Sequence, residues 1–204
     1  MKPHGLVAVP SVAQPSPLLT RSIRALYWRD SFLGSCVAIA PSIVMTAGHH
    51  YNAVRDDVGD FSVLTRPGHW AAVEYAVKDS TYDVAVFWLC EEVTAYTALR
   101  GYLPAVGARV TTVWLSPKPP HDAIVSPGVV VESEEENCVA RGTVSTTGSS
   151  GAPVVDIFGE HIVGLHLTSN TRGGSRVSGF IPSRKLVSLL TDMWVEHGRV
   201  SSSA

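Results

Sequence analysis

Short apolar runs alternate with turn-forming residues along almost the whole chain. In the first half, six runs rich in Val, Ile and aromatic residues are separated by Gly, Asp and Pro: IRALYW, FLGSCVAIA, SIVMTA, FSVLT, WAAVEYAV and DVAVFWL. After the segment ALRGYLPAVG, six more follow: RVTTVWL, AIVSPGVVVES, NCVARGTVS, APVVDI, HIVGLHLTS and SRVSGFI. Runs of this length and composition are typical of β-strands. The pattern predicts about six strands in each half of the chain.

Helical spacing appears only near the C-terminus. There, apolar residues follow an i, i+3, i+4, i+7, i+8 spacing after Ser183, a suitable N-cap; they are Leu186, Leu189, Leu190, Met193 and Trp194. We therefore expect one C-terminal helix that packs its apolar face on the core, with a docking role for Trp194 as the alternative.

These elements predict an all-β protein of two six-stranded antiparallel β-barrels, closed by a C-terminal helix, with a cleft between the barrels. Two segments lie outside the predicted helix and barrels: a leader rich in Pro and Ser, and a short connection in the middle of the chain. The expected order is an extended leader (1–20), the first barrel (21–98), an interdomain linker (99–107), the second barrel (108–182), and the helix with its tail (183–204).

The composition is that of a globular protein without a basic surface. Of the 204 residues, 45% are hydrophobic and 17% are charged, and the formal net charge is −2, so nothing indicates a nucleic-acid partner. No apolar stretch approaches the roughly 20 residues needed to cross a bilayer, and prolines interrupt the N-terminus where a signal peptide would be apolar. We expect a monomer without a membrane span or a secretion signal.

The three cysteines, Cys36, Cys90 and Cys138, are an odd number without CxxC spacing. They predict neither a disulfide framework nor a zinc site, and they favour a reducing compartment. We therefore expect a cytoplasmic protein with no metal and no cofactor.

The stretch STTGSSGAPVV places Ser150 between two glycines, directly before a predicted strand. It is either a plain turn or a tight loop that carries a serine nucleophile. A serine hydroxyl needs a general base, normally an imidazole that a carboxylate orients. His49 in VMTAGHHY and Asp83 in TYDVAVFWL supply these groups, and the three residues follow in the order His, Asp, Ser at separations of 34 and 67 residues.

Each of the three candidates has a rival of the same chemistry. His50 adjoins His49, and Ser149 adjoins Ser150. Asp79, four residues before the chosen aspartate, is either a turn carboxylate or a substitute acid. The sequence motifs favour the chosen residues, because the histidine ends a Thr-Ala-Gly-His stretch and the aspartate leads directly into an apolar strand.

Three stretches in this order resemble the chymotrypsin-like serine proteases. TAGH is similar to their Thr-Ala-x-His stretch, DVAV to their Asp-x-Ala stretch, and GSSGAP to their Gly-x-Ser-Gly-x-Pro loop. The resemblance covers residues 23 to 194. SxxGxSGxP and the later GLHLTSN look most like the polyprotein-processing proteases of positive-strand RNA viruses, with sobemovirus-like enzymes closest in spacing and arterivirus and astrovirus proteases as neighbours.

The resemblance implies a serine endopeptidase with His49, Asp83 and Ser150 as its catalytic triad. It also implies an oxyanion hole made by the backbone N–H groups of Gly148 and Ser150. The substrate would be a polypeptide, namely a viral polyprotein that includes the enzyme's own precursor, in the cytoplasm of a host cell.

At two positions the chain differs from the secreted members of this family, and these differences indicate which members it resembles. Those enzymes have an aspartate before the nucleophile, where this chain has Ser149, so activation through an ion pair with a new N-terminus is not expected. They also have a cysteine after the catalytic histidine, where this chain has His50, and we expect Cys36 to lack a partner as a result. Both departures favour an intracellular member.

The resemblance also implies the substrate preference. Trypsin-like enzymes place an aspartate six residues before the nucleophile, where this chain has Val144, so cleavage after a basic residue is not favoured. His166 and Ser145 correspond to residues that accept Glu or Gln before the cut, and Asn170 follows on the same strand. The alternative is that the histidine is a satisfied core residue.

Other interpretations remain beside this one. The acidic run ESEEEN (Glu132–Asn137) predicts a solvated turn, with a cleavage site or metal site as alternatives. The first alternative function is a non-viral, intracellular or bacterial endopeptidase of the trypsin-like or glutamyl type. The second is a catalytically silent binding module of the same fold. An α/β hydrolase is excluded, because its nucleophile elbow needs glycine at Ala152 and its triad order is reversed.

Overall fold

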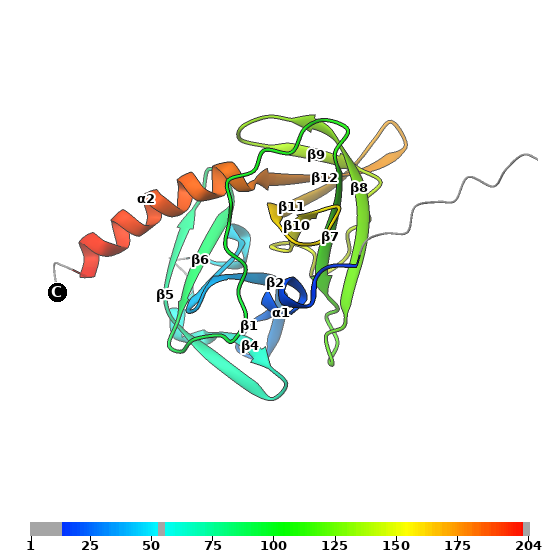
Figure 1. The fold of residues 1–204 in the computed structure, drawn as a ribbon. Coiled ribbons are helices and arrows are strands. Elements are labelled where there is room, and N and C mark those ends of the chain that lie inside the picture. The colour runs from blue at the N-terminus through cyan, green and yellow to red at the C-terminus, as the bar shows by residue number, and fades with distance from the viewer. Residues whose placement is uncertain (1–13, 53–55, 202–204) are drawn as a thin grey trace, which may run out of the picture.

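The computed structural model describes residues 14–52 and 56–201 and contains two closed antiparallel β-barrels (Figure 1). The first has the strand order β1-β2-β3-β6-β5-β4, and the second has the order β10-β11-β12-β9-β8-β7. The predicted fold class is therefore confirmed. The strands of the first barrel are β1 (Ile23–Trp28), β2 (Ser31–Ala40), β3 (Ile43–Ala47), β4 (Phe61–Arg66), β5 (His69–Asp79) and β6 (Val84–Leu89). Those of the second are β7 (Arg109–Leu115), β8 (Ala123–Ser133), β9 (Cys138–Arg141), β10 (Pro153–Asp156), β11 (Ile162–Arg172) and β12 (Ser175–Pro182).

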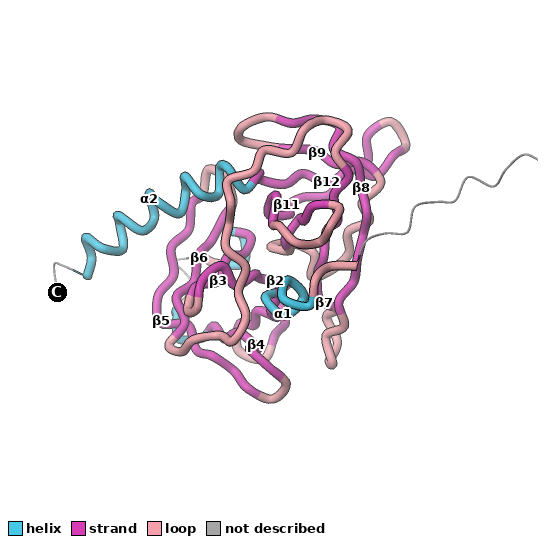
Figure 2. Tube along the Cα trace, in the orientation of Figure 1, coloured by secondary structure: helices cyan, strands magenta, loops and turns pink. Residues whose placement is uncertain are grey.

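The connection between the barrels has no regular structure. It runs from β6 to β7 along the outside of the molecule, as a long loop in Figure 2. Two short 3-10 turns, η1 (Gly48–His50) and η2 (Val58–Asp60), interrupt the first barrel. The first of them carries both histidines of the TAGHH stretch.

The segment expected to be an extended leader is partly helical. Helix α1 (Pro17–Ser22) begins after Ser16, whose Oγ accepts a hydrogen bond from the Leu19 N–H at 3.2 Å. Proline at the first helical position is favourable because it has no N–H to leave unpaired. The Ser16 cap and this proline explain why a helix forms in a segment whose Pro-rich composition did not predict one. Residues 1–13 of the leader lie outside the described residues.

Each barrel has its own apolar core, and a third cluster joins the two. Leu26, Phe61 and Phe87 belong to the first core, and Val154 and Phe180 belong to the second. The joining cluster combines residues from both barrels and the C-terminal helix, among them Ile43, Val86, Val113, Leu165 and Leu186. Because burying one such side chain contributes about 1.5–3 kcal/mol, this cluster holds the barrels in a fixed relation.

Helix α2 (Ser183–Ser201) packs as the periodicity predicts, with Leu186, Leu189 and Met193 buried. Trp194 is 55% exposed, although its ring lies 6.3 Å from that of Trp88. Ser183 is the first helical residue, and its Oγ accepts a hydrogen bond from the Tyr102 N–H of the linker at 2.8 Å. This serine therefore fastens the linker to the helix.

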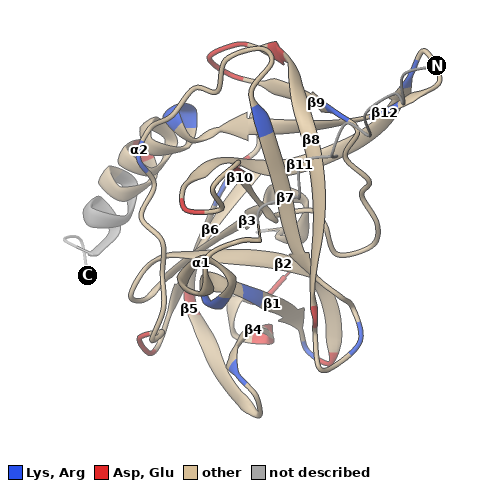
Figure 3. Cartoon of the chain, turned by 45° about the vertical axis from the view of Figure 1, so that its right-hand side comes forward, with Lys and Arg blue, Asp and Glu red and all other residues tan. Residues whose placement is uncertain are grey.

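The acidic run forms an exposed tip between β8 and β9, seen in red at the top of Figure 3. Its side chains are solvated as predicted, but they are also paired. Glu135 lies 3.0 Å from Arg184, and Glu136 accepts a hydrogen bond of 2.7 Å from the Tyr82 hydroxyl of the first barrel. Tyr82 directly precedes Asp83, so this tip of the second barrel contacts the residue next to the candidate aspartate.

Two further sequence features have structural counterparts. Cys36 and Cys138 are buried and Cys90 is exposed, and all three are free thiols. Within residues 14–52 and 56–201, no helix combines the length and the apolar character that crossing a membrane requires.

Candidate active site

The candidate base and acid lie together at one end of the first barrel. His49 follows β3, Asp83 precedes β6, and the two strands pair antiparallel with Ala47 opposite Val84. This register brings the two side chains together, with His49 Nδ1 2.7 Å from Asp83 Oδ2. Because an ionised carboxylate only accepts, Nδ1 carries the proton and donates it. The Nε2 atom is then left with a lone pair, as a general base requires.

The backbone supports the same pair. The Gly48 N–H donates to the Asp83 carbonyl oxygen at 2.6 Å. Asp83 has a φ of 55°, a left-handed conformation that few residues other than glycine adopt, although aspartate tolerates it better than most. Its rival Asp79 accepts hydrogen bonds from the N–H groups of Thr81 and Tyr82, at 2.8 and 3.0 Å. Asp79 is therefore the turn carboxylate of the two interpretations considered.

His50 has a different environment from its neighbour. His49 is exposed, whereas His50 is half-buried, and its Nδ1 lies 2.9 Å from Thr46 Oγ1. The Thr46 hydroxyl already donates its proton to the Ser35 carbonyl at 2.9 Å, so His50 Nδ1 must be the donor. Burial and, to a smaller extent, the neighbouring His49 lower the pKa of His50 to about 3. His50 is thus a neutral, hydrogen-bonded packing residue.

The residue that faces His50 is Gly34, where the sequence suggested Cys36. A Cβ atom placed on Gly34 would lie 2.7 Å from Cε1 of His50 and 3.1 Å from the Ser150 carbonyl oxygen. Cys36 is two residues further along β2, where its Sγ donates to the Arg24 carbonyl and burial raises its pKa to about 12. As expected, Cys36 is a free thiol, but Gly34 and not Cys36 is the residue of β2 that faces His50. The imidazole itself fills the space over Gly34.

The Ser150 loop lies against the strand that leads to His49. Gly148 and Gly151 have φ angles of 93° and 77°, which only glycine adopts without strain. A Cβ atom on Gly151 would clash with Thr46 Oγ1 and would lie 2.8 Å from the Ala47 nitrogen. The serine loop and the histidine strand are thus in direct contact, across the junction of the two barrels.

Within this loop, exposure separates the two serines. Ser149 is only 3% exposed, and its N–H donates to the Thr146 carbonyl at 3.1 Å. Ser150 is partly exposed, and its Oγ makes no hydrogen bond to His49 or to any other described residue. The N–H groups of Gly148 and Ser150 likewise have no acceptor among the described residues. Of these two serines, Ser150 is therefore the one whose hydroxyl is accessible, and it lies beside the unengaged N–H groups of Gly148 and Ser150.

Ser35 of β2 is a contact residue that the sequence did not single out. It is fully buried, and its N–H donates to the Gly148 carbonyl at 3.1 Å. Its Oγ accepts from the Leu115 N–H of β7 at 3.0 Å, while its carbonyl accepts from Thr46. Ser35 therefore links the strand of the histidine, the serine loop and the second barrel. The only sequence signal is a small polar residue inside the apolar run FLGSCVAIA.

His166 lies beside the serine loop on β11. Its carbonyl accepts from the Gly151 N–H at 2.9 Å, and its own N–H donates to the Ala152 carbonyl at 2.8 Å. The imidazole is only 1% exposed, and its Nδ1 is buried without a partner. Burial lowers the pKa of His166 to about 4, so the ring is neutral at pH 7. His166 is therefore buried like a core residue, but its Nδ1 lacks the hydrogen bond that a satisfied core histidine would make.

The other two predicted substrate contacts differ in position. Ser145 is half-buried, five residues before Ser150 in the same loop. Asn170 is exposed on the outer part of β11, about 13 Å along the strand from His166 at the usual strand rise, and no hydrogen bond joins the two. The structure thus does not bring Asn170 to His166.

Two buried hydroxyls near this strand were not anticipated. Thr143 and Ser178 are each 1% exposed and share a short hydrogen bond. Ser178 lies two residues before Phe180, which is the partner of His166 in the β11–β12 pair. Among the described residues, no three His, Cys, Asp or Glu side chains are grouped as a metal site.

No protein-family model and no curated protein sequence matches the chain. Its fold, however, is similar to that of many solved structures. Kallikrein-related peptidase 10 has a TM-score of 0.70 at 15% identity, over 90% of this chain and 100% of that one. The inactivated protease paralogue S-I1 of the scabies mite has a TM-score of 0.69 at 15% identity, over 91% and 100%. An inactive mutant of Rv3671c from M. tuberculosis has a TM-score of 0.68 at 16% identity, over 91% and 97%. The chain therefore has the fold of the chymotrypsin-like serine proteases.

Proposed function

We propose that this protein is a serine endopeptidase with His49, Asp83 and Ser150 as its catalytic triad. The observation that carries the proposal is the hydrogen bond of 2.7 Å between His49 and Asp83, at a barrel end against which the Ser150 loop packs. In unliganded enzymes, the bond between nucleophile and base is often long and tightens only when substrate binds. The unengaged Ser150 hydroxyl is compatible with that state.

The reaction is an acyl transfer. Ser150 Oγ attacks the peptide carbonyl while His49 Nε2 takes its proton, and the same nitrogen later returns a proton to the leaving amine. Asp83 keeps the proton of the imidazole on Nδ1 and stabilises the imidazolium that forms. Water then hydrolyses the acyl-enzyme through the same base.

The oxyanion of the tetrahedral intermediate would bind to the N–H groups of Gly148 and Ser150. Both donors are free of protein acceptors among the described residues, and the left-handed turn at Gly148 supports their orientation toward one point. Removal of one such donor in this type of site costs about 2.7–4 kcal/mol of transition-state stabilisation. The Ser35 N–H, bonded to the Gly148 carbonyl, keeps that turn in place.

We infer that cleavage follows Glu or Gln, with His166 and Ser145 as the residues that read the side chain. The backbone of His166 is hydrogen-bonded to that of Gly151 and Ala152, the two residues that follow Ser150. These bonds support the place of His166 in the wall of the pocket. A neutral imidazole and a hydroxyl can each donate one hydrogen bond to a carboxylate or amide oxygen. An apolar substrate side chain would leave these donors unpaired and would therefore be disfavoured.

The natural substrate we propose is a viral polyprotein, including the enzyme's own precursor, in the host cytoplasm. The support is the resemblance of the SxxGxSGxP and GLHLTSN stretches to proteases of positive-strand RNA viruses. A non-viral endopeptidase with the same specificity is the alternative. Expression of a longer precursor would separate the two, because only a self-processing enzyme releases its own termini.

A catalytically silent binding module is the second candidate function. One structural neighbour is named as an inactivated protease paralogue, so this fold also occurs without activity. The absence of a hydrogen bond from Ser150 Oγ to His49 among the described residues is the feature that favours it here.

One experiment decides between the two candidates. A peptide library with varied residues before the cut is incubated with the protein, with Ser150→Ala and with Thr147→Ala, an exposed hydroxyl in the same loop. We expect cleavage after Glu or Gln by the first and third proteins, and a loss of about 10⁶-fold for Ser150→Ala at unchanged melting temperature. Undiminished hydrolysis by Ser150→Ala would contradict the triad, and a preference for Arg or Lys would contradict the role of His166.

A further inference from the structure

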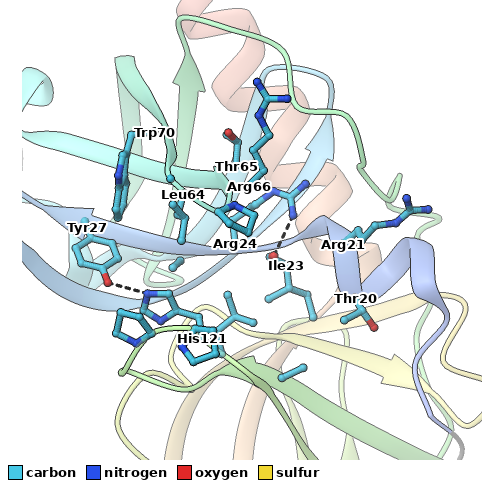
Figure 4. Close-up of a pocket in the computed structure, with 17 residues that line it drawn as sticks. Thr20, Arg21, Ile23, Arg24, Tyr27, Leu64, Thr65, Arg66, Trp70 and His121 are labelled. Atoms are coloured by element: carbon cyan, nitrogen blue, oxygen red, sulfur yellow. Dashed lines mark hydrogen bonds between the residues drawn. The ribbon is translucent and has the colours of Figure 1, made fainter.

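A pocket of about 470 Å³ lies between strand β1, the β4–β5 hairpin and the β7–β8 turn (Figure 4). None of the candidate catalytic or substrate-binding residues lines it. Its volume falls within the range of small-molecule sites, about 300–1,000 Å³. The side chains that define its chemistry are Arg21, Arg24, Tyr27, Arg66, Trp70 and His121.

The pocket is positively charged although the chain has a net charge of −2. Three arginines line it and no aspartate or glutamate does. Arg21 and Arg66 are exposed, whereas Arg24 is only 7% exposed. No ion pair joins any of the three to a described carboxylate. This surface would therefore attract an anion.

Arg24 is the residue that most needs a partner. Its Nη1 donates to the Ile23 carbonyl at 3.3 Å, the contact drawn as a dashed line in Figure 4. Its Nε is buried without any hydrogen bond, and its Nη2 has no acceptor among the described residues. Burial lowers the pKa of Arg24, which is the sign of an under-solvated cation. A buried charge without a partner is unfavourable, and a bound anion would relieve this cost.

The other polar groups of the pocket are already engaged. His121 Nδ1 donates to the Ser116 carbonyl at 2.7 Å, so its Nε2 is the acceptor for the Tyr27 hydroxyl at 2.8 Å. Figure 4 shows Tyr27 and His121 turned toward each other in this contact. The ligand's charge would therefore be read by guanidinium groups, whose paired N–H donors match a carboxylate.

The rest of the lining is apolar. Tyr27 and Trp70 meet edge to face with ring centroids 4.7 Å apart, and Trp70 is 45% exposed. Leu64, Leu115 and Pro119 complete the apolar wall. A bare inorganic anion would leave these surfaces wet, whereas an anion on an apolar body would cover them and gain about 25 cal/mol for each Å² buried.

We propose that this pocket binds a carboxylate carried on an aromatic or branched aliphatic body, with Arg24 as the principal charge partner. Two sources supply that chemistry, a free small carboxylic acid and the C-terminal residue of a peptide. The site shares no residue with the candidate triad, so binding to it can be tested separately from the proposed proteolysis.

The test is a titration of the full chain with 3-phenylpropionate and its neutral match, 3-phenylpropionamide. Binding is followed by calorimetry and by fluorescence of Trp70, whose response is identified by its loss in Trp70→Phe. We expect the acid to bind at least about tenfold more tightly than the amide, because only the acid pairs with the guanidinium. Inorganic phosphate should bind more weakly than the acid. Equal affinity for acid and amide, or phosphate binding as tight as that of the acid, would overturn the proposal.

Variants locate the site. Arg24→Met should weaken binding of the acid at least about tenfold, and Arg24→Lys less, because lysine keeps the charge but not the forked donors. Arg172→Met, in the distant β11–β12 hairpin, should leave binding unchanged. If Arg24→Met does not fold, as judged by its melting temperature, Trp70→Ala at an exposed position must weaken binding of the acid. Unchanged affinity in the folded variants would refute the assignment.

Peptides separate the two sources. In the Ser150→Ala background, which prevents cleavage, Gly-Gly-Phe with a free carboxylate is compared with Gly-Gly-Phe-amide. Tighter binding of the free peptide than of 3-phenylpropionate supports a C-terminal residue as the ligand. Binding of the small acid alone supports a free metabolite, and binding of neither contradicts the proposal.

Discussion

The two halves of the candidate active site are held in different ways. The His49–Asp83 pair is assembled within the first barrel, where β3 and β6 pair side by side and the Gly48 N–H binds the Asp83 carbonyl. The Ser150 loop belongs to the second barrel, but its contacts lead to the first barrel through Ser35 and Thr46. The candidate base is thus positioned locally, whereas the position of the candidate nucleophile depends on the junction between the barrels.

This difference has a physical consequence. A substitution in the first half can remove chemistry while the packing stays intact, because its hydrogen bond is exposed and local. A substitution at the junction changes stability and geometry together, because Ser35 is fully buried and serves three segments. Stability and activity measured on the same variants therefore distinguish the two halves.

The largest effect in the first half is expected for Asp83→Asn. The amide has the same shape but no charge, and it can hold the imidazole in the wrong tautomer, so kcat should fall by about 10⁴-fold. The melting temperature should change little, because the carboxylate is partly exposed. Asp79→Asn, at the turn carboxylate, is the matched control and should keep full activity. If Asp83→Asn retained activity within tenfold of the wild type, the assignment of this aspartate would be wrong.

The junction is tested by Ser35→Ala. The substitution leaves the buried Leu115 N–H without an acceptor, so the free energy of unfolding should decrease by about 1–3 kcal/mol. The backbone bond from the Ser35 N–H to the Gly148 carbonyl remains, but β7 loses its bond to β2 at Leu115, whose carbonyl oxygen lies against Gly148. We therefore expect kcat/KM to fall as well, by about 10²-fold for a displacement of 1 Å.

Ser183→Ala provides the control for this prediction. Ser183 Oγ likewise accepts a backbone N–H bond, from Tyr102 at 2.8 Å, but at the linker and helix α2. It should cost a similar free energy of unfolding with no loss of kcat/KM. Equal kinetic losses in both variants would show that the junction has no special role.

Much of this architecture was accessible from the sequence because it depends on local pattern. Runs rich in Val, Ile and aromatic residues, separated by turn residues, predict the twelve strands, and the order of TAGH, DVAV and GSSGAP singles out the pair that the structure joins, His49 and Asp83. Asp83 was preferred to Asp79 because an apolar strand follows it; in the structure Asp83 bonds to His49, whereas Asp79 accepts the bonds of its own turn.

The remaining features depend on which residues meet after folding. The sequence did not show that His50 faces Gly34 and not Cys36, because two residues along a strand are a small step in sequence but about 7 Å in space. The three-way role of Ser35 and the unpaired guanidinium of Arg24 arise where distant strands meet. Helix α1 was not predicted because its segment is rich in proline. In the structure the Ser16 cap stabilises the helix despite this composition.

A smaller effect is expected for the specificity residue of the second half. His166→Leu removes the proposed hydrogen-bond donor at similar volume, so the preference for Glu or Gln over Leu before the cut should fall at least about tenfold. Asn170→Ala, further out on β11, should change this ratio less than twofold. The ratio of kcat/KM values for paired peptides measures both. A greater effect of Asn170→Ala than of His166→Leu would show that the pocket wall lies further out along the strand.

Two histidines with lowered pKa values, one in each half, make the stability depend on pH. The pKa of His50 is lowered to about 3 and that of His166 to about 4, so below pH 6.5 the unfolded chain binds protons that the folded chain does not. Stability should therefore fall as the pH decreases from 6.5 toward 4, by about 1–2 kcal/mol for each histidine between pH 6.5 and 5. Urea unfolding at these pH values measures the loss. His50→Gln, which can still donate to Thr46, should lose about 1–2 kcal/mol less than the wild type over this interval. Parallel curves for the two proteins would mean that His50 is protonated in the folded state and does not fill the space over Gly34 as a neutral ring.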